Sequence, residues 1–187
     1  MNKKLVAALS GGAALVLALT GCGGESGNKK LDNWAKKICD QMPPQVKRIQ
    51  DANHQIAGVQ TDEDSKKVQE TDSAAFQTNV DAYKSLAAVV QNAGAPPVKG
   101  GEANQKDAVK ALEDLSGSYA ELKKRIDALD VNNKSQFGES LKGIAADIGK
   151  LGGKSDDALK KLQSGDVGKA MAKHPGCQKT PATPSAK

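Results

Sequence analysis

The chain has 187 residues, a formal net charge of +5 and an aromatic content of only 3%. With so few aromatic side chains, any core is built from Ala, Leu, Ile and Val, which favours closely approaching helices over broad aromatic-lined pockets. The positive charge is too small to indicate a protein that binds nucleic acid.

Residues 1–21 have the composition of an export signal. Lys3 and Lys4 precede residues 5–19, which contain no charged side chain. This apolar stretch is interrupted by glycine and is shorter than the about 20 residues that a spanning helix needs. A basic start, a short apolar region and small residues before a cleavage point predict a signal peptide over residues 1–21.

The expected cleavage point lies within Leu19-Thr20-Gly21-Cys22, before the cysteine. These four residues resemble the lipobox of bacterial lipoproteins. That resemblance implies a diacylglyceryl group on the sulfur of Cys22, cleavage before this residue, and palmitate-like acyl chains that hold the protein on the extracytoplasmic face of the cell membrane. Two or three acyl chains anchor a protein stably, because each buried methylene contributes about 0.8 kcal/mol. The alternative is an ordinary secretory signal that leaves Cys22 as a spare thiol.

The segments that flank the middle of the chain are poor in apolar side chains. Residues 22–28 are rich in glycine, which predicts a flexible tether behind the lipid. Residues 180–187 combine proline with small and polar residues, which is typical of a disordered tail. We therefore expect one domain over residues 29–179, long enough to bury a core of its own.

Apolar residues recur at helical spacing in four stretches of this domain, and no stretch alternates as a strand does. The pattern predicts an all-α fold. The stripes are Leu31, Trp34 and Ile38 followed by Val46, Ile49, Ala52 and Ile56; Phe76, Val80, Tyr83, Ala87 and Val90; Ala108, Leu112, Leu115, Tyr119, Leu122, Ile126 and Leu129; and Phe137, Leu141, Ile144, Ile148 and Leu151.

Helix-breaking and capping residues separate the stripes. Pro43 and Pro44 are expected to kink or break the first one. Residues 58–61, 93–101 and 131–133 are expected connections, and such short connections favour an antiparallel bundle of four main helices. A short C-terminal helix is predicted to begin at Ser155, with another helical turn over residues 166–173.

The chain has three cysteines. If Cys22 carries lipid, Cys39 and Cys177 remain as an even pair in a compartment where thiols oxidise. We expect them to form a disulfide between the C-terminal arm and the first helix. The alternative is a reactive thiol or a metal ligand, which the absence of a Cys-x-x-Cys motif disfavours.

Basic residues are concentrated toward both ends of the mature chain. Removing Lys3 and Lys4 leaves 25 of the 27 basic residues against 22 acidic ones, a formal charge of +3. Residues 29–48 contain six basic and two acidic residues, residues 49–133 nine and fourteen, and residues 134–187 ten and five. The expected disulfide would join the two basic ends on the tethered side. That side is expected to meet anionic lipid or anionic wall polymer, and the alternative is ordinary solvated lysine.

The sequence contains no pattern that indicates catalysis or a bound metal. Its histidines, His54 and His174, lie far apart, and no nucleophile, phosphate-loop or zinc motif occurs. Residues 62–64 are acidic but lack the spacing of a calcium loop, which favours a helix N-terminus. We therefore expect neither an enzyme nor a cofactor.

Small residues line the predicted fourth helix one position beyond its apolar stripe: Gly138, Ala145, Gly149 and Gly152. Each interior glycine costs a helix up to about 1 kcal/mol relative to alanine, which requires a compensating reason. Close approach of a neighbouring helix is one reason. The other is an apolar groove that holds a lipid or a small hydrophobic molecule.

The whole chain resembles the small secreted lipoproteins of actinobacteria that are rich in alanine and lysine. The resemblance is carried by the lipobox, by Trp34 and Cys39, and by the late Pro-Gly-Cys that ends at Cys177. It implies a non-enzymatic envelope protein and no catalytic residues. The expected function is an interaction or structural module on the outer face of the membrane, and the alternative is a carrier of a small hydrophobic ligand.

Overall fold

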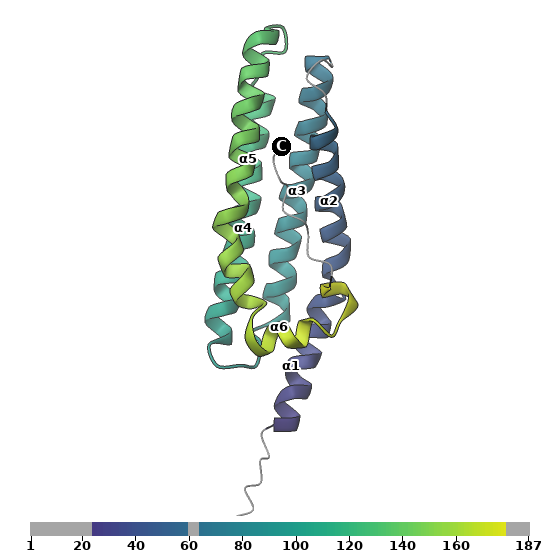
Figure 1. Cartoon of the computed structure of the whole chain (residues 1–187), viewed down its shortest axis with the longest axis vertical. Helices are drawn as coiled ribbons and strands as arrows, with labels where there is room; N and C mark the ends of the chain where they lie inside the picture. Colours follow the sequence, from purple (N-terminus) through teal and green to yellow (C-terminus); the bar gives the residue numbers. More distant parts are fainter. Residues whose placement is uncertain (1–23, 60–63, 179–187) are drawn as a thin grey trace, which may run out of the picture.

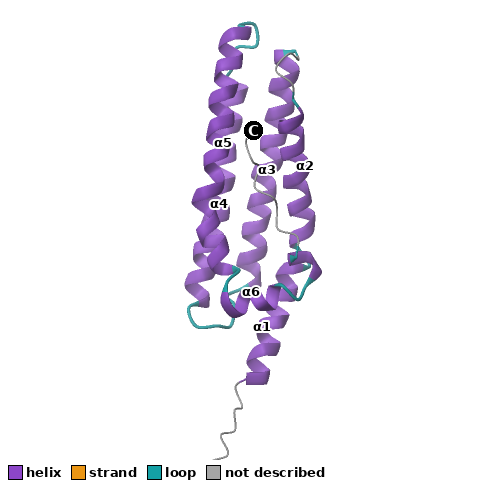
Figure 2. Ribbon diagram, in the orientation of Figure 1, coloured by secondary structure: helices purple, strands orange, loops and turns teal. Residues whose placement is uncertain are grey.

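A computed structural model of the chain describes residues 24–59 and 64–178. These residues form α-helices and one short 3-10 helix, with no strand among them (Figures 1 and 2). The all-α class that the apolar stripes predict is confirmed. The elements are α1 (Gly24–Cys39), α2 (Met42–Gly58), α3 (Ser65–Ala93), α4 (Gly101–Asp127), α5 (Lys134–Leu162), α6 (Gly165–Met171) and η1 (Pro175–Cys177).

The helix boundaries follow from local backbone chemistry. Pro43 and Pro44 lie in the first turn of α2, where a missing N–H costs nothing, so the predicted break falls between α1 and α2. The Asp64 carboxylate accepts hydrogen bonds from the backbone N–H groups of Lys66 and Lys67, which caps α3. Gly94 follows the end of α3 with φ +79°, a conformation that side chains disfavour.

Two expected boundaries are wrong. Residues 24–28, the described part of the expected tether, are helical and form the start of α1. The helix extends outward through them from the packed turns that come next in the chain. The separate helix expected from Ser155 is also not formed, since α5 continues without a break to Leu162. Leu159 and Leu162 pack against the core that lies around α1, and this burial offsets the low helix propensity of the glycines before them.

The four longest helices, α2 to α5, lie side by side, and α3 packs against both α2 and α4 (Figure 1). α4 also packs against α5, whereas the described residues of α2 and α5 make little contact with each other. α1 lies at one end and projects beyond the other helices, and α6 crosses next to it. Successive neighbours in the chain therefore account for most of the packing.

The apolar interior has two parts. The first lies around α1 and α6 and includes Trp34, Ile38, Leu86 and Met171. The second lies between α3, α4 and α5 and contains five buried residues, Phe76, Tyr119, Leu122, Ile126 and Ile144. The stripes predicted from sequence supply all five buried residues of the second part and half of the sixteen buried residues of the first. Among the described residues, no helix is long and apolar enough to cross a membrane.

Candidate functional site

A disulfide joins Cys39, the last residue of α1, to Cys177 in η1, with their Cα atoms 5.0 Å apart. The predicted pairing of these two cysteines is confirmed. A side chain at Gly176 would collide with the carbonyl oxygen of Cys39, so a glycine is needed for the C-terminal arm to lie this close to α1. The bond spans 138 residues and brings the two ends of the domain together.

Trp34 fixes α1 against the connection between α3 and α4. Its side chain is buried, and its indole Nε1–H donates to the carbonyl oxygen of Gly94 at 2.8 Å. Lys37 donates from Nζ to the carbonyl oxygen of Asn92 at 2.6 Å. These two bonds satisfy carbonyl groups at the end of α3 that the helix itself leaves free. The same connection is therefore held beside α1 by both apolar and polar contacts.

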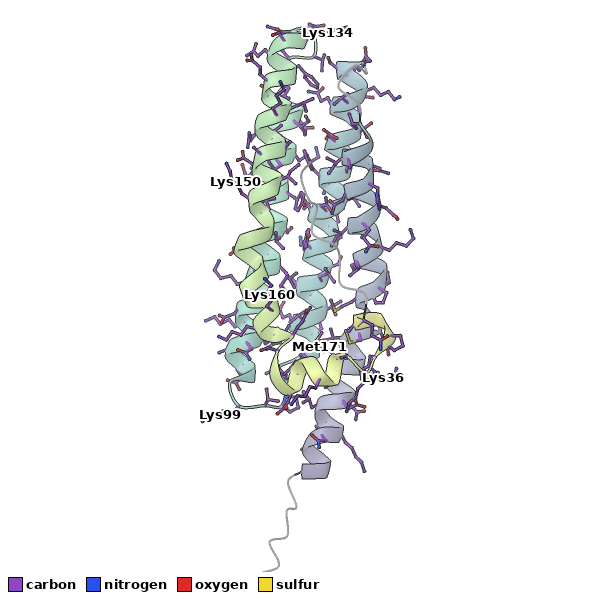
Figure 3. All side chains as sticks on the ribbon, in the orientation of Figure 1. Lys36, Lys99, Lys134, Lys150, Lys160 and Met171 are labelled. Carbon is purple, nitrogen blue, oxygen red and sulfur yellow. A yellow bond between two sulfur atoms is a disulfide. The ribbon has the colours of Figure 1, made fainter. Side chains whose placement is uncertain are left out.

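The elements joined in this way carry many of the basic side chains. We use the term basic end for α1, residues 94–100, residues 159–162 of α5, and residues 165–178. Figure 3 shows Lys36 and Lys99 at this end of the molecule, with Lys134 at the opposite end. The lysines of the basic end are Lys29, Lys30, Lys36, Lys37, Lys99, Lys160, Lys161, Lys169 and Lys173.

Four of these lysines form ion pairs on the surface. The pairs are Lys36–Asp40 at 2.6 Å, Lys161–Asp107 at 3.5 Å, Lys169–Asp166 at 3.2 Å and Lys173–Asp32 at 3.9 Å. Exposed pairs of this kind contribute little to stability, about 0 to 1 kcal/mol each. They do reduce the local positive charge.

Besides Lys37, whose Nζ donates to the carbonyl oxygen of Asn92, three lysines of the basic end have no such neutralising partner. Among the described residues, Lys29, Lys30 and Lys99 form no ion pair, and all three side chains are exposed. The net positive charge of the basic end is therefore concentrated on α1 and on the connection between α3 and α4.

The structure separates the remaining candidate residues. His54 is exposed on α2, whereas His174 follows α6, with its Nε2 3.4 Å from Asp32 Oδ1. Of the acidic residues 62–64, Asp64 caps α3 as predicted for a helix N-terminus, and the other two lie outside the described residues. In the described part of the chain, no group of three or more His, Cys, Asp or Glu could hold a metal ion.

The strip of small residues on α5 is mostly turned outward. Ala145 and Gly149 are exposed, and Gly138 is half-buried with no atom within 4 Å of the place where a Cβ would stand. A close helix approach therefore does not explain Gly138. Gly152 lies in a stretch of α5 whose side chains are not described. A ligand groove along this strip remains a prediction.

Two buried polar residues on α3 are not among the candidates that the sequence patterns indicate. Asp72 and Asn79 lie on either side of the fully buried Phe76, one helical turn away in each direction, and are 6% and 0% exposed. The Asn79 amide donates to Asn53 Oδ1 at 3.2 Å, but Asn79 Oδ1 and Asp72 Oδ1 accept no hydrogen bond from the described residues. Burial raises the pKa of Asp72 to about 6. The spacing of these two residues from Phe76 matches the helical period of the apolar stripe of α3. That spacing was the sequence signal for their burial.

Comparison with known proteins gives no match: no protein family, no curated protein and no solved structure has significant similarity to the chain.

Loss of the disulfide is expected to weaken the basic end first. Replacing both cysteines, C39A with C177A, should lower the free energy of unfolding by about 2 to 5 kcal/mol, because a long loop in the unfolded chain is released. Chemical denaturation measures this change, and reduction of the wild-type protein is the matched control. Hydrogen exchange should show faster exchange in α6 than in α3. An unchanged unfolding midpoint would contradict the prediction.

The buried carboxyl group of Asp72 is expected to make stability fall as pH rises. The folded protein retains this proton up to about pH 6, whereas the unfolded chain releases it near the ordinary value of 3.8. Stability should therefore decrease by about 2 to 3 kcal/mol between pH 4 and pH 6 and then level off.

Denaturation at several pH values measures this effect. Asp72→Asn should remove the decrease, because its side chain cannot ionise, while Asp81→Asn on the exposed face of α3 should retain it. The attribution to Asp72 fails if Asp72→Asn and the wild type show the same dependence on pH.

Proposed function

We propose that the chain is a lipid-anchored envelope protein held on the extracytoplasmic face of the cell membrane through Cys22. It acts there as a non-enzymatic interaction or structural module, built as an antiparallel bundle of helices. The lipobox residues Leu19-Thr20-Gly21-Cys22 are the observation that carries this proposal. The helical domain is the part of the protein that such an anchor would hold at the membrane.

The position of α1 is consistent with an anchor at its start. Cys22 precedes the first residue of α1, Gly24, by two positions, so at most about 7 Å of chain separates them. α1 projects from the end of the molecule where the basic end lies (Figure 1). A lipid on Cys22 would therefore present the basic end, and not the opposite end of the long helices, to the membrane.

The disulfide supports an extracytoplasmic location. Disulfides form and persist in oxidising compartments and are rare in the cytosol. The chain places its two non-lipobox cysteines at bonding distance across 138 residues. This arrangement is useful to a protein that functions outside the cytoplasm, where the bond is retained.

Lipid attachment at Cys22 is expected to be directly measurable. The full-length chain, expressed in a bacterium that processes lipoproteins and fed an alkyne-bearing fatty acid, should become labelled and fractionate with membranes. Cys22→Ser should abolish the label, because the acceptor sulfur is absent. The variant C39A with C177A should retain the label, since these cysteines do not accept lipid. A labelled Cys22→Ser protein, or an unlabelled wild-type protein, would contradict the proposal.

A second candidate function is a carrier of a small hydrophobic ligand, favoured by the unpaired oxygens of Asp72 and Asn79. Half-buried apolar side chains surround the second part of the interior and come from α2, α3, α5 and the connection after α4: Ile56, Val80, Tyr83, Leu129, Leu141, Ile148 and Leu151. An unpaired buried acceptor costs about 1 to 3 kcal/mol, which a ligand with a hydrogen-bond donor would offset.

A carrier is expected to retain its ligand during gentle purification. Native mass spectrometry of the protein from its source should then show a mass above that of the lipidated chain, and Asp72→Asn should reduce the occupied fraction. Asp81→Asn, on the exposed face of the same helix, should not change it. A wild-type protein without added mass argues against the carrier.

A further inference from the structure

We propose that the basic end is a docking surface for the anionic phospholipid headgroups of the membrane that holds Cys22. The orientation of the surface rests on the proposed lipid anchor, but its affinity for anionic lipid does not. Lys29, Lys30 and Lys99 are the side chains to which we assign the contact.

The distance along α1 places the first two lysines near the anchor. Lys29 is five residues beyond Gly24, which corresponds to a rise of about 7.5 Å along a helix. The two chain steps from Cys22 to Gly24 add at most about 7 Å, so Lys29 and Lys30 are within about 16 Å of Cys22 along the chain. This upper bound exceeds the Debye length of about 8 to 10 Å at moderate ionic strength, so the attraction acts when the exposed lysine side chains reach the headgroups themselves.

The third lysine is held beside α1 by the fold. Lys99 lies in the connection between α3 and α4, whose start is bound to α1 through the hydrogen bond from Trp34 to Gly94. Figure 3 places Lys99 at the same end of the molecule as Lys36. Residues distant in sequence thus present their charge on one end, and this arrangement does not depend on the lipid.

Charge pairing distinguishes these three lysines from their neighbours. Lys36, Lys161, Lys169 and Lys173 already have carboxylate partners, so binding an anionic headgroup would compete with those pairs. Lys29, Lys30 and Lys99 have no such competitor among the described residues. They are therefore free to approach phosphate groups without losing an existing ion pair.

The membrane is favoured over a soluble anionic polymer because of where the charge lies. A wall polymer could reach lysines on any exposed face, including Lys134 and Lys142 at the far end of α5. A membrane at Cys22 meets the basic end first. The unpaired lysines of the basic end are those that such a surface would contact.

Vesicle sedimentation tests the surface without the lipid anchor. The chain from residue 22 onward, carrying Cys22→Ser, keeps every residue that the structure describes. It is mixed with vesicles of phosphatidylcholine alone, or of phosphatidylcholine with an equal amount of phosphatidylglycerol. We expect binding to the anionic vesicles only, and we expect salt at about 1 M to abolish it, because the Debye length falls to about 3 Å.

The variant K29Q with K30Q and K99Q should lower the partition coefficient on anionic vesicles on the order of 100-fold, since each lysine near such a surface contributes about fivefold. The control variant K84Q with K134Q and K142Q removes the same charge from exposed lysines outside the basic end and should retain most of the binding. All six lysines are exposed, so neither variant is expected to unfold the protein.

Equal binding to neutral and anionic vesicles would overturn the proposal, as would equal losses in the two variants. Binding to soluble poly(glycerol phosphate) without binding to anionic vesicles would also overturn it, in favour of a wall polymer. Because this assay uses a chain without lipid, its failure leaves the labelling of Cys22 unaffected. Failure of that labelling likewise leaves the vesicle result valid.

Discussion

The covalent bond between Cys39 and Cys177 is the constraint on which the arrangement of this domain depends. It joins the end of the first helix to the last described helical turn, so the short α6 is held across α1. Without the bond, α6 would rely on a few buried side chains, including Val167, Ala170 and Met171. A seven-residue helix is too short to be stable alone, because helix nucleation is costly. The disulfide therefore determines where the C-terminal arm lies.

The same constraint determines the charge distribution. Basic residues from both ends of the chain gather at one end of the molecule because α1 and α6 pack together there. Most of their ion pairs are exposed and weak, so the lysines are not required for folding. Their concentration next to the proposed anchor instead gives the molecule a direction relative to the membrane. The fold and the proposed orientation therefore both depend on the packing of α1 against α6.

The long helices have a different character. Their interior is apolar around Phe76 and Tyr119, yet it retains Asp72 and Asn79 on the most buried face of α3. A buried carboxyl group with a raised pKa costs stability at neutral pH. An apolar residue at this position would pack without that cost. This conflict between local chemistry and burial is the feature that a ligand would explain, and it lies far in sequence from the anchor.

The sequence by itself determined the all-α class, the main helix boundaries and the pairing of Cys39 with Cys177. These depend on local periodicity, on proline and capping residues, and on the number of cysteines, all of which can be read along the chain. It did not determine the length of α1 and α5, because packing of Leu159 and Leu162 extends a helix through glycines that locally disfavour it. Nor did it show that Ala145 and Gly149 are exposed, or that Asp72 Oδ1 is buried without a hydrogen-bond partner among the described residues. Only the tertiary structure decided these points, because burial and ion pairing depend on which helices become neighbours.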